Sequence, residues 1–453
     1  MFERGIPTVL TAAALAHLRD AGVQPRSIVA WLGHNSWDML ATLAACERLG
    51  AVLLPLNWRL APAELAHIVQ HAGVSLLLGS PEMESAAAEV LAAVPGGLAP
   101  PGAAQGVQRD DLLLVYTSGT TGAPKGAMLT RQGIAANTLA AVAAQGLHAQ
   151  SRVLAVLPLF HVGGLCIQIL PALAVGAKVL LHARFDADAW FDAVAQWRPS
   201  TSLLVPAVMK ALIEHPRWVG ADLSSLAHVV SGSQIVPRAL IDAFHARDLP
   251  VAQVYGATET GPMSIVLKPD EAMAHAGMAG RPAMGVSLRL GSDGEVQLKA
   301  PQLMRGYHRS SEVPFDDEGW FHTGDLAREH AGGWFEIVGR RGDMIISGGE
   351  NIHPAEIENL VASLPGVAAC AVVGLPHPRW GEVPVLAVVR AAGPVGDALS
   401  AHGFEQALQA QLARFKRPQR VEFVQALPTT ALGKVARAQL RLQLLGMRSA
   451  DAG

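Results

Sequence analysis

Short apolar runs alternate with amphipathic stretches from about residue 26 to residue 260. The apolar runs are rich in Val, Leu and Ile, which is typical of buried strands. They predict strands at Ile28–Leu32, Val52–Pro55, Leu112–Tyr116, Val153–Leu157, Lys178–Leu181, Ser202–Val205, Ala227–Val230 and Val251–Tyr255. A helical pattern follows most of these runs, most clearly at Phe185–Trp197, where Asp186 is placed to cap the helix. Continuous apolar strands separated by helices indicate parallel sheets covered by helices on both faces, which is an α/β fold.

The hydrophobic pattern changes from about Gly291 onward. Two expected strands, Glu295–Leu298 and Trp334–Val338, come with many Gly and Asp turns and predict a small β-rich subdomain. After Gly339 the pattern predicts an α+β unit. Its expected helices and strands are Pro354–Leu364, Val367–Val373, Val385–Arg390, Phe404–Leu412 and Arg420–Val424. The sequence therefore predicts a large N-terminal domain over residues 1–339, a connecting segment over 340–345 and a small C-terminal domain over 346–453.

One long apolar stretch, Val153–Ala177, contains no Asp, Glu, Lys or Arg and has the length of a membrane span. Several Pro and Gly residues interrupt it, so we expect a buried strand, a tight turn and a buried helix that ends near Ala174. Near the N-terminus, Thr8–Leu18 is only mildly apolar, which favours an ordinary amphipathic helix over a signal peptide. We therefore expect a cytoplasmic protein without a membrane span.

The composition excludes several classes of protein. The 453 residues are 50% hydrophobic and 16% charged, which excludes intrinsic disorder as the main state. The formal net charge is −3, and this value argues against a nucleic-acid binder that relies on overall basicity. The three cysteines, Cys46, Cys166 and Cys370, lie far apart and form neither a disulfide framework nor a CxxC metal pair, which fits a reducing compartment.

Polar, glycine-rich segments follow four of the expected strands. These segments are residues 117–126, 158–164, 231–235 and 256–261. In open α/β folds, ligands bind beyond the carboxyl ends of the strands. We therefore expect these four loops to form the binding site.

The loop over residues 117–126 carries groups that suit a polyphosphate. Its glycines let backbone N–H groups face an anion, its hydroxyl side chains add hydrogen-bond donors, and Lys125 adds a positive charge. The hydroxyl residues are Thr117, Ser118, Thr120 and Thr121. A P-loop NTPase is disfavoured, because Gly119 and Gly122 are only three apart and Gly126, rather than Ser or Thr, follows the lysine.

The string Tyr116-Thr-Ser-Gly-Thr-Thr-Gly-Ala-Pro-Lys-Gly126 resembles the phosphate-binding motif of adenylate-forming enzymes. This superfamily contains acyl-CoA synthetases, luciferases and peptide-synthetase adenylation domains. Further motifs appear in the family's order, and the resemblance covers nearly the whole chain. They are Leu157-Pro-Leu-Phe-His-Val-Gly-Gly164, Tyr255-Gly-Ala-Thr-Glu-Thr260, His322-Thr-Gly-Asp325, Gly339-Arg-Arg-Gly-Asp-Met-Ile-Ile-Ser-Gly-Gly-Glu-Asn-Ile-His-Pro354 and Pro428-Thr-Thr-Ala-Leu-Gly-Lys434.

The resemblance implies which residues bind ATP and Mg2+. The phosphate loop contributes Thr117, Ser118, Gly119, Thr120, Thr121, Gly122 and Lys125. Contacts to adenine and the α-phosphate are expected from Gly232, Ser233, Tyr255, Gly256 and Thr258, and contacts to the ribose from Asp325 and Arg340. Glu259 matches the family's magnesium-binding glutamate, with Thr117 as a second metal ligand. Lys434 is similar to the family's essential adenylation lysine, and His161 matches a residue that positions the carboxylate.

The resemblance also implies the sites for CoA and for the acyl group. Positions similar to those that hold CoA are Arg59, Gly348, Gly349, Trp380, Phe415 and Arg417. The expected acyl pocket contains His161, Val162, Gly163, Val205 and Ala257. Asp343 matches the family's hinge, about which a small mobile C-terminal domain rotates between the two half-reactions.

The main prediction is an AMP-forming carboxylate–CoA ligase, an acid–thiol ligase that uses ATP, Mg2+ and CoA. An acyl-AMP ligase that loads a carrier protein and a catalytically silent acyl-adenylate-binding protein are the alternatives. The pocket residues favour an apolar tail, and the local resemblance to aroyl-CoA and o-succinylbenzoate-CoA ligases leaves aromatic acids, medium-chain fatty acids and o-succinylbenzoate open. Expected partners are the acid, ATP and CoA without nucleic acid, and a homodimer is left open.

Overall fold

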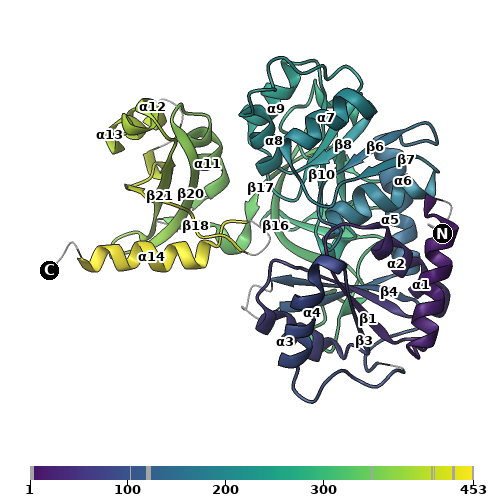
Figure 1. The fold of residues 1–453 in the computed structure, drawn as a ribbon. Helices are drawn as coiled ribbons and strands as arrows, with labels where there is room; N and C mark the ends of the chain where they lie inside the picture. The colour runs from purple at the N-terminus through teal and green to yellow at the C-terminus, as the bar shows by residue number, and fades with distance from the viewer. Residues whose placement is uncertain are drawn as a thin grey trace. The chain divides into compact units, whose positions relative to one another are not determined.

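The computed structural model describes residues 5–102, 104–118, 124–347, 350–409, 412, 414–430 and 434–450. The chain divides into two compact units (Figure 1). The first unit comprises the described residues of Met1–Ser233, Ala243–Leu288 and Leu298–His322. The second comprises those of Gln234–Asp242, Arg289–Gln297 and Thr323–Gly453. The hinge expected over residues 340–345 stays a prediction.

The first unit contains a six-stranded sheet with the order β15-β5-β4-β2-β1-β3. Its strands are β1 (Ile28–Leu32), β2 (Val52–Leu56), β3 (Leu76–Gly79), β4 (Asp111–Ser118), β5 (Pro124–Thr130) and β15 (Gly306–Tyr307). The pairs among β1 to β4 are parallel, whereas β5 runs antiparallel to β4, and β15 runs antiparallel to β5. The predicted phosphate loop therefore connects two adjacent antiparallel strands.

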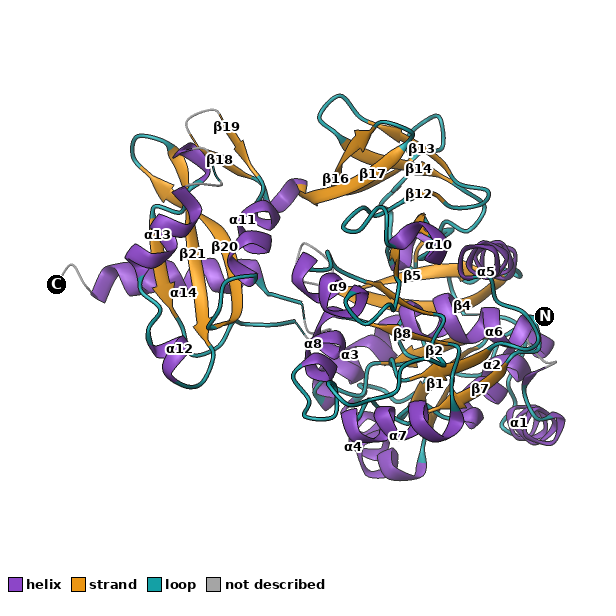
Figure 2. Ribbon diagram, turned by 90° about the horizontal axis from the view of Figure 1, so that it is seen from above, coloured by secondary structure: helices purple, strands orange, loops and turns teal. Residues whose placement is uncertain are grey.

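A seven-stranded sheet has the order β12-β11-β10-β9-β8-β6-β7 (Figure 2 shows strands of both sheets with helices on either side). Its strands are β6 (Arg152–Ala155), β7 (Lys178–Leu181), β8 (Thr201–Leu204), β9 (His228–Gly232), β10 (Val251–Tyr255), β11 (Ile265–Leu267) and β12 (Arg281–Pro282). The strands from β6 to β10 are parallel. Their carboxyl ends therefore lie on one edge, and three of the predicted loops follow them.

Helices pack on these sheets and on the sheets of the second unit. The α-helices are α1 (Thr8–Asp20), α2 (Trp37–Leu49), α3 (Pro62–Ala72), α4 (Glu84–Ala93), α5 (Arg131–Gln145), α6 (Leu170–Ala174), α7 (Ala187–Trp197), α8 (Pro206–Ile213), α9 (Arg238–His245), α10 (Pro269–Ala272), α11 (Pro354–Ala362), α12 (Pro394–Asp397), α13 (Ala401–Gln409) and α14 (Arg437–Ala450). As predicted, the Asp186 carboxylate caps α7, because it accepts the N–H of Ala189 at 2.9 Å.

Strand β1 shows why these segments read as continuous apolar runs. Val29 and Trp31 point into a hydrophobic cluster formed with α1 and α2. Ile28 and Ala30 point to the opposite face, into a cluster formed with α3 and α4. Because successive side chains of a strand alternate between faces, a strand covered on both faces needs apolar residues throughout. The predicted α/β class is confirmed.

Two smaller sheets belong to the later part of the chain. One has the order β13-β14-β16-β17 and contains the two strands expected in the β-rich subdomain. The other has the order β19-β18-β21-β20, with β22 paired to β21. The bounds are β13 (Ser287–Leu290), β14 (Glu295–Lys299), β16 (Phe321–His330), β17 (Trp334–Arg340), β18 (Ile345–Ser347), β19 (Glu350–Ile352), β20 (Val367–His377), β21 (Gly381–Arg390) and β22 (Arg420–Phe423).

The long uncharged stretch at residues 153–177 is a buried part of the first unit. After β6 and a turn, the chain forms a π-helical segment over Gly163–Ile169 and then α6, all of it buried up to Leu173. This is the strand, turn and buried helix expected from the sequence. In the described ranges of the chain, no helix is long and apolar enough to cross a membrane.

The three cysteines are in separate surroundings, and none of them forms a disulfide in the part of the chain that the structure describes. Burial raises the pKa of the Cys46 thiol and of the Cys166 thiol to about 12. Cys370, on β20 in the second unit, is only partly buried. The two cysteines of the first unit therefore belong to its core.

Candidate active site

A threonine, a glutamate and a tyrosine from three separate segments meet in the first unit. Thr117 lies at the end of β4, Glu259 lies in the 3-10 turn Thr258–Thr260 that follows β10, and Tyr307 lies in β15. The hydroxyl of Thr117 donates to Oε1 of Glu259 at 3.1 Å, and the hydroxyl of Tyr307 donates to the same oxygen at 3.2 Å. The contact therefore joins the carboxyl ends of strands from two different sheets.

The local sequence around Glu259 holds its turn in place. A Cβ at Gly256 would lie 2.0 Å from the carbonyl oxygen of Pro262, so only glycine allows the chain to fold back this closely after β10. Thr260 closes the turn, because its hydroxyl accepts the N–H of Ala257 at 2.8 Å. The carbonyl oxygen of Glu259 accepts the N–H of Met304 at 2.8 Å. The turn is thus attached to the segment that leads into β15.

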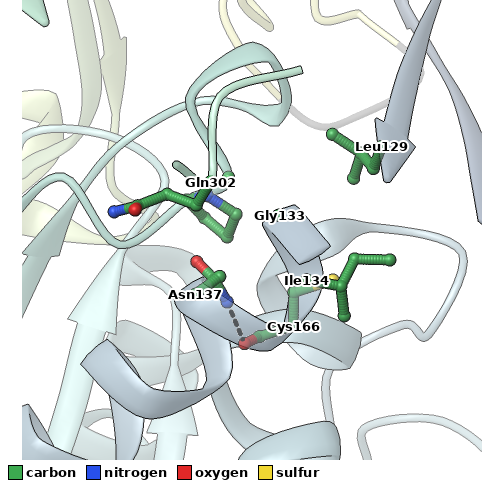
Figure 3. Close-up of a pocket in the computed structure, with 8 residues that line it drawn as sticks. Leu129, Gly133, Ile134, Asn137, Cys166 and Gln302 are labelled. Carbon is green, nitrogen blue, oxygen red and sulfur yellow. Dashed lines mark hydrogen bonds between the residues drawn. The ribbon is translucent and has the colours of Figure 1, made fainter. Parts of the chain in front are cut away.

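A small cavity lies behind this turn (Figure 3). Its volume is about 10 Å³, which is room for one water molecule at most. Asn137 donates to the carbonyl of Cys166 at 2.8 Å and accepts the N–H of Met263 at 3.1 Å. The amide of Gln302 donates to the carbonyl of Met263 at 3.0 Å. These buried amides support the chain that carries Glu259, and the cavity is too small for a substrate.

Lys125, the predicted phosphate-binding lysine, has two neighbours in the first unit. Its Nζ lies 2.5 Å from Oε2 of Glu312 and 5.2 Å from the ring centre of Tyr307. The backbone of Ser118 forms the last position of β4 and pairs with Pro124. Other predicted phosphate-loop residues lie outside the described residues, namely Gly119, Thr120, Thr121 and Gly122.

His161 and Ser233 gather at Gly163, at the carboxyl edge of the seven-stranded sheet. The N–H of Gly163 donates to Nδ1 of His161 at 3.0 Å, so Nε2 is the ring nitrogen that carries the proton in the neutral histidine. A Cβ at Gly163 would lie 3.6 Å from the hydroxyl of Ser233, whose backbone φ is +71°. A Cβ at Gly232 would lie 2.3 Å from the carbonyl of Val254, so close strand packing requires glycine there.

The remaining predicted adenine and acyl-pocket residues follow strands of the same sheet. Tyr255 ends β10, and Ala257 and the buried Thr258 follow it. Val162 is buried after β6, and the half-buried Val205 lies between β8 and α8. Because β6, β8 and β10 are parallel, these residues share one edge of the sheet.

The two predicted ribose contacts form an ion pair in the second unit. Nε of Arg340, at the end of β17, lies 2.7 Å from Oδ1 of Asp325 on β16. Asp325 is mostly buried and Arg340 is half exposed. The N–H of Gly324 donates to Glu295 at 3.0 Å, and Glu295 also pairs with Arg341. Two ion pairs, Asp325–Arg340 and Glu295–Arg341, therefore hold the residues at and just after the end of β17.

Asp343, the predicted hinge residue, pairs with Arg437 of the second unit at 3.2 Å. Arg437 is the first residue of α14 and also binds both carboxylate oxygens of Glu358 on α11, at 2.6 and 2.9 Å. Burial would lower the pKa of the Arg437 guanidinium, but the carboxylates of Glu358 and Asp343 more than offset it, so that pKa is raised. The guanidinium fastens the start of α14 to α11.

Lys434 lies three residues before Arg437 and is exposed. Its carbonyl accepts the N–H of Thr430 at 2.7 Å, and its N–H donates to the Thr430 hydroxyl at 3.3 Å. Thr429 and Val435 form an antiparallel bridge. The segment that carries Lys434 is therefore closed at its base by backbone hydrogen bonds, while its side chain lies at the surface.

The predicted CoA residues occupy different surroundings. The guanidinium carbon of Arg59 lies 5.1 Å from the ring centre of Trp58 and 5.7 Å from that of Phe160, and burial lowers the pKa of Arg59. Trp380 is 39% exposed. Arg417 donates to the carbonyls at the end of the α13 region. Gly348 and Gly349 lie outside the described residues, as does the side chain of Phe415.

Two family models match the chain. A model described as AMP-binding enzyme matches residues 11–308, and a model described as AMP-binding enzyme C-terminal domain matches residues 356–434. The chain belongs to the AMP-binding enzyme family. The resemblance to adenylate-forming acyl-CoA synthetases, which was based on short motifs, is confirmed over most of its length.

Relatives of this AMP-binding enzyme match it almost end to end. It is 43% identical to an indoleacetate–CoA ligase of Aromatoleum aromaticum, over 94% of this chain and 89% of that protein. It is 41% identical to a feruloyl-CoA synthase of an Amycolatopsis species, over 96% and 94%. ATP-bound MatB from Rhodopseudomonas palustris matches 96% of this chain and 92% of that one, at 29% identity and a TM-score of 0.84.

A second solved structure is similar to this AMP-binding enzyme. It is the o-succinylbenzoate coenzyme A synthetase from Bacillus subtilis in complex with ATP and magnesium ion. Identity is 28% and the TM-score is 0.82, over 95% of this chain and 93% of that one. The adenylate-forming fold predicted from the motifs is therefore confirmed by structures as well as by sequences.

Three residues of the AMP-binding enzyme sites were not found by sequence reasoning. Tyr307, Glu312 and Arg437 contact Glu259, Lys125 and Asp343 respectively. Tyr307 lies 48 positions from Glu259, and Glu312 lies 187 positions from Lys125. Arg437 lies outside the motif that contains Asp343, so no local pattern links any of the three pairs. Only the folded chain brings them together.

Proposed function

We propose that this protein is an AMP-forming carboxylate–CoA ligase whose acid is aromatic. In the first half-reaction, a carboxylate oxygen of the acid bonds to the α-phosphorus of ATP, and the bond between that phosphorus and the pyrophosphate oxygen breaks. In the second, the CoA thiolate bonds to the acyl carbonyl carbon, and the bond from that carbon to the AMP oxygen breaks. The products are pyrophosphate, AMP and an acyl-CoA thioester.

The family resemblance implies which residues bind ATP. Lys125 and the loop that begins at Thr117 bind the phosphates, because cationic and N–H donors stabilise the charge that develops there. Tyr255 stacks on the adenine and Thr258 contacts the α-phosphate. The carboxylate of Asp325 accepts hydrogen bonds from the ribose hydroxyls. Its ion pair with Arg340, in which Nε and Oδ1 lie 2.7 Å apart, fixes the orientation of this carboxylate.

The donor set at Thr117 and Glu259 fits Mg2+. A hydroxyl oxygen and a carboxylate lie 3.1 Å apart, and Mg2+ prefers such oxygen ligands together with substrate phosphates. In the parts of the chain that the structure describes, no cluster of three or more His, Cys, Asp and Glu side chains forms a metal cage. Bound there, Mg2+ would neutralise phosphate charge that otherwise repels the incoming carboxylate.

Lys434 supplies the cation for adenylation, because an ammonium between the carboxylate and the α-phosphate stabilises both in the transition state. His161 positions the carboxylate. Rotation about Asp343 then replaces Lys434 by the CoA path along Gly348 and Gly349. The nucleotide end of CoA is bound by Arg59, Trp380, Phe415 and Arg417.

The observation that carries this proposal is the contact between Thr117 and Glu259. The two residues are 142 positions apart, and each comes from a different family motif. Their side chains nonetheless meet at the ends of β4 and β10, as the metal and phosphate site of this family requires.

The aromatic substrate is proposed from the relatives. Curated relatives that are 41% to 43% identical are named for indoleacetate and ferulate, which are both aryl-substituted acids. The expected acyl pocket contains Val162, Gly163, Val205 and Ala257, which are small or apolar. We also propose that the protein works in the cytoplasm, where both ATP and CoA are supplied.

The test is a pyrophosphate-release screen with ATP and Mg2+ over indole-3-acetate, ferulate, benzoate, o-succinylbenzoate, octanoate and malonate. Aromatic acids are expected to release pyrophosphate, and AMP is expected to appear only when CoA is added. Activity confined to octanoate would overturn the aromatic assignment. Pyrophosphate release without CoA-dependent AMP release would instead indicate an acyl-AMP ligase.

A further inference from the structure

Tyr307 contacts Glu259 from a segment outside the motifs that contain Thr117 and Glu259. It lies on β15, the edge strand next to β5, where it pairs with Ala127. Three residues earlier, the N–H of Met304 donates to the carbonyl of Glu259. The segment over residues 304–307 therefore contacts both the backbone and the carboxylate of Glu259.

The hydrogen bonds at the Glu259 carboxylate are asymmetric. The hydroxyls of Thr117 and Tyr307 both donate to Oε1, at 3.1 and 3.2 Å. Two donors on one oxygen fix the rotation of the carboxylate plane. Oε2 then takes a fixed direction, as a ligand oxygen must when it binds a cation of strict geometry.

The aromatic ring of Tyr307 lies near the ammonium group of Lys125. The ring centre lies 5.2 Å from Nζ of Lys125, which is within the range of a cation–π contact. The ring also packs against the main hydrophobic cluster of the first unit. The two ends of one side chain thus touch the anion and the cation of the same site.

We propose that Tyr307 is a positioning residue that orients Glu259 for the divalent cation of the bound nucleotide. The inference rests on the proposed function, since it needs a metal–nucleotide complex at Thr117 and Glu259. Tyr307 acts through Glu259 and touches no reacting atom. Loss of its hydroxyl releases the carboxylate plane and weakens the metal–nucleotide complex, while the ring keeps its packing and its contact with Lys125.

The variant Tyr307→Phe isolates the hydroxyl. Calorimetry with the full-length protein compares a non-hydrolysable ATP analogue in Mg2+ with the same analogue in EDTA. Outer-shell partners of metal ligands are typically worth 10- to 100-fold in metal affinity, so we expect about a tenfold loss with Mg2+ and none in EDTA. Mn2+ binding followed by electron paramagnetic resonance should weaken by the same factor.

The control is Thr42→Val on α2, which removes a buried hydroxyl that donates to the carbonyl of Asp38 at 2.8 Å and lies outside the family motifs. It should leave the Mg2+ dependence unchanged. A double variant with Glu259→Gln measures the coupling. If Tyr307 acts through Glu259, adding Tyr307→Phe to Glu259→Gln causes no further loss.

Equal losses with Mg2+ and in EDTA, or full additivity in the double variant, would overturn the proposal. These binding measurements need no carboxylic acid, so they remain readable if the substrate is misassigned. Failure of the wild-type protein to bind the Mg2+–nucleotide analogue at all would contradict the proposed function itself. A loss of unfolding free energy in Tyr307→Phe without a change in metal affinity would indicate a purely structural residue.

Discussion

Lys125 has a carboxylate partner at the position where it is proposed to meet a phosphate. Glu312 lies 2.5 Å from its ammonium, and the two side chains are 48% and 24% exposed respectively. Exposed ion pairs of this kind contribute about 0.2–1 kcal/mol, so ATP can displace the carboxylate at a small cost. The pair keeps the lysine in place without competing strongly with the nucleotide.

Glu312→Gln should therefore lower the KM for ATP by about 1.4- to 5-fold, the factor that corresponds to an exposed pair. The kcat should not change, because Glu312 makes no contact with reacting groups. Steady-state kinetics with Glu89→Gln, an exposed glutamate on α4, is the control. A raised KM would show that Glu312 assists nucleotide binding.

Lys434→Ala should separate the two half-reactions. We expect pyrophosphate release to fall about 100- to 1,000-fold, since charge stabilisation of a transition state is worth this much. Thioester formation from supplied acyl-adenylate and CoA should be nearly unchanged. Lys178→Ala, at an exposed strand end, is the matched control. Full adenylation by Lys434→Ala would refute the assigned role.

Among the helices, α14 depends on one side chain at its first residue. Arg437 binds Glu358 through two hydrogen bonds and also donates to the carbonyl of Val372 at 2.8 Å. Further along, Leu440 and Leu444 pack on β20 and β21 (Figure 2 shows α14 beside these strands). The helix is therefore held by the ion pairs of the mostly buried Arg437 and by the packing of its apolar face.

Arg437→Ala should destabilise the second unit by about 3–5 kcal/mol, because it leaves the carboxylate of Glu358 without its main partner. Scanning calorimetry should show the loss in the transition of that unit. Arg441→Ala, on the same helix, breaks one contact of a 42% exposed side chain with Glu382 and should cost less than about 1 kcal/mol. Equal losses of unfolding free energy in Arg437→Ala and Arg441→Ala would contradict the proposed role of Arg437 in holding α14.

Strands of the two large sheets include some that the sequence predicted well. The predicted bounds of β1 match the structure, because it is a continuous apolar run that is buried on both faces. The bounds of β7 and β10 also match, although β7 is only partly buried and β10 contains Gln253. The prediction missed β16 and α14. In β16, exposed and buried residues mix, and Gly324 has a φ of +70°. In α14, Leu440 and Leu444 are the buried side chains among the described residues 437–447.

The residues of the candidate site also divide into those that the sequence predicted and those that it did not. Motif residues such as Thr117 and Glu259 were predicted because their spacing is a family pattern. Their partners Tyr307 and Glu312 were not, because those contacts arise from the pairing of β15 with β5 and from the loop that follows it. Sequence patterns therefore predicted the chemistry of the site, and the tertiary structure added the groups that orient it.

For the molecule as a whole, two buried histidines make the free energy of unfolding depend on pH. Burial lowers the pKa of His228 and of His308 to about 4, below the ordinary value of 6.5. For His308, the positive charges of Arg309 and Arg305 act in the same direction. The unfolded chain binds protons at these residues before the folded chain does, so their contribution to stability is complete above pH 6.5 and is lost as the pH falls toward 4.

The free energy of unfolding should therefore decrease between pH 7 and pH 5, by up to about 1.4 kcal/mol per pH unit for each histidine once the pH lies well below 6.5. Urea denaturation at a series of pH values measures this slope. His308→Gln should reduce the slope, whereas His402→Gln, at a 74% exposed position, should leave it unchanged. A slope that is the same in all three proteins would rule out this linkage.

The distribution of the cysteines has a practical consequence. Cys46 and Cys166 are buried and their thiols resist ionisation, whereas Cys370 of β20 is partly exposed. A maleimide dye added to the native protein should therefore attach at Cys370 first, since the thiolate is the reactive form. The wild-type chain thus offers a labelling position in its second unit. A fluorophore there could follow the proposed rotation between half-reactions without removal of any cysteine.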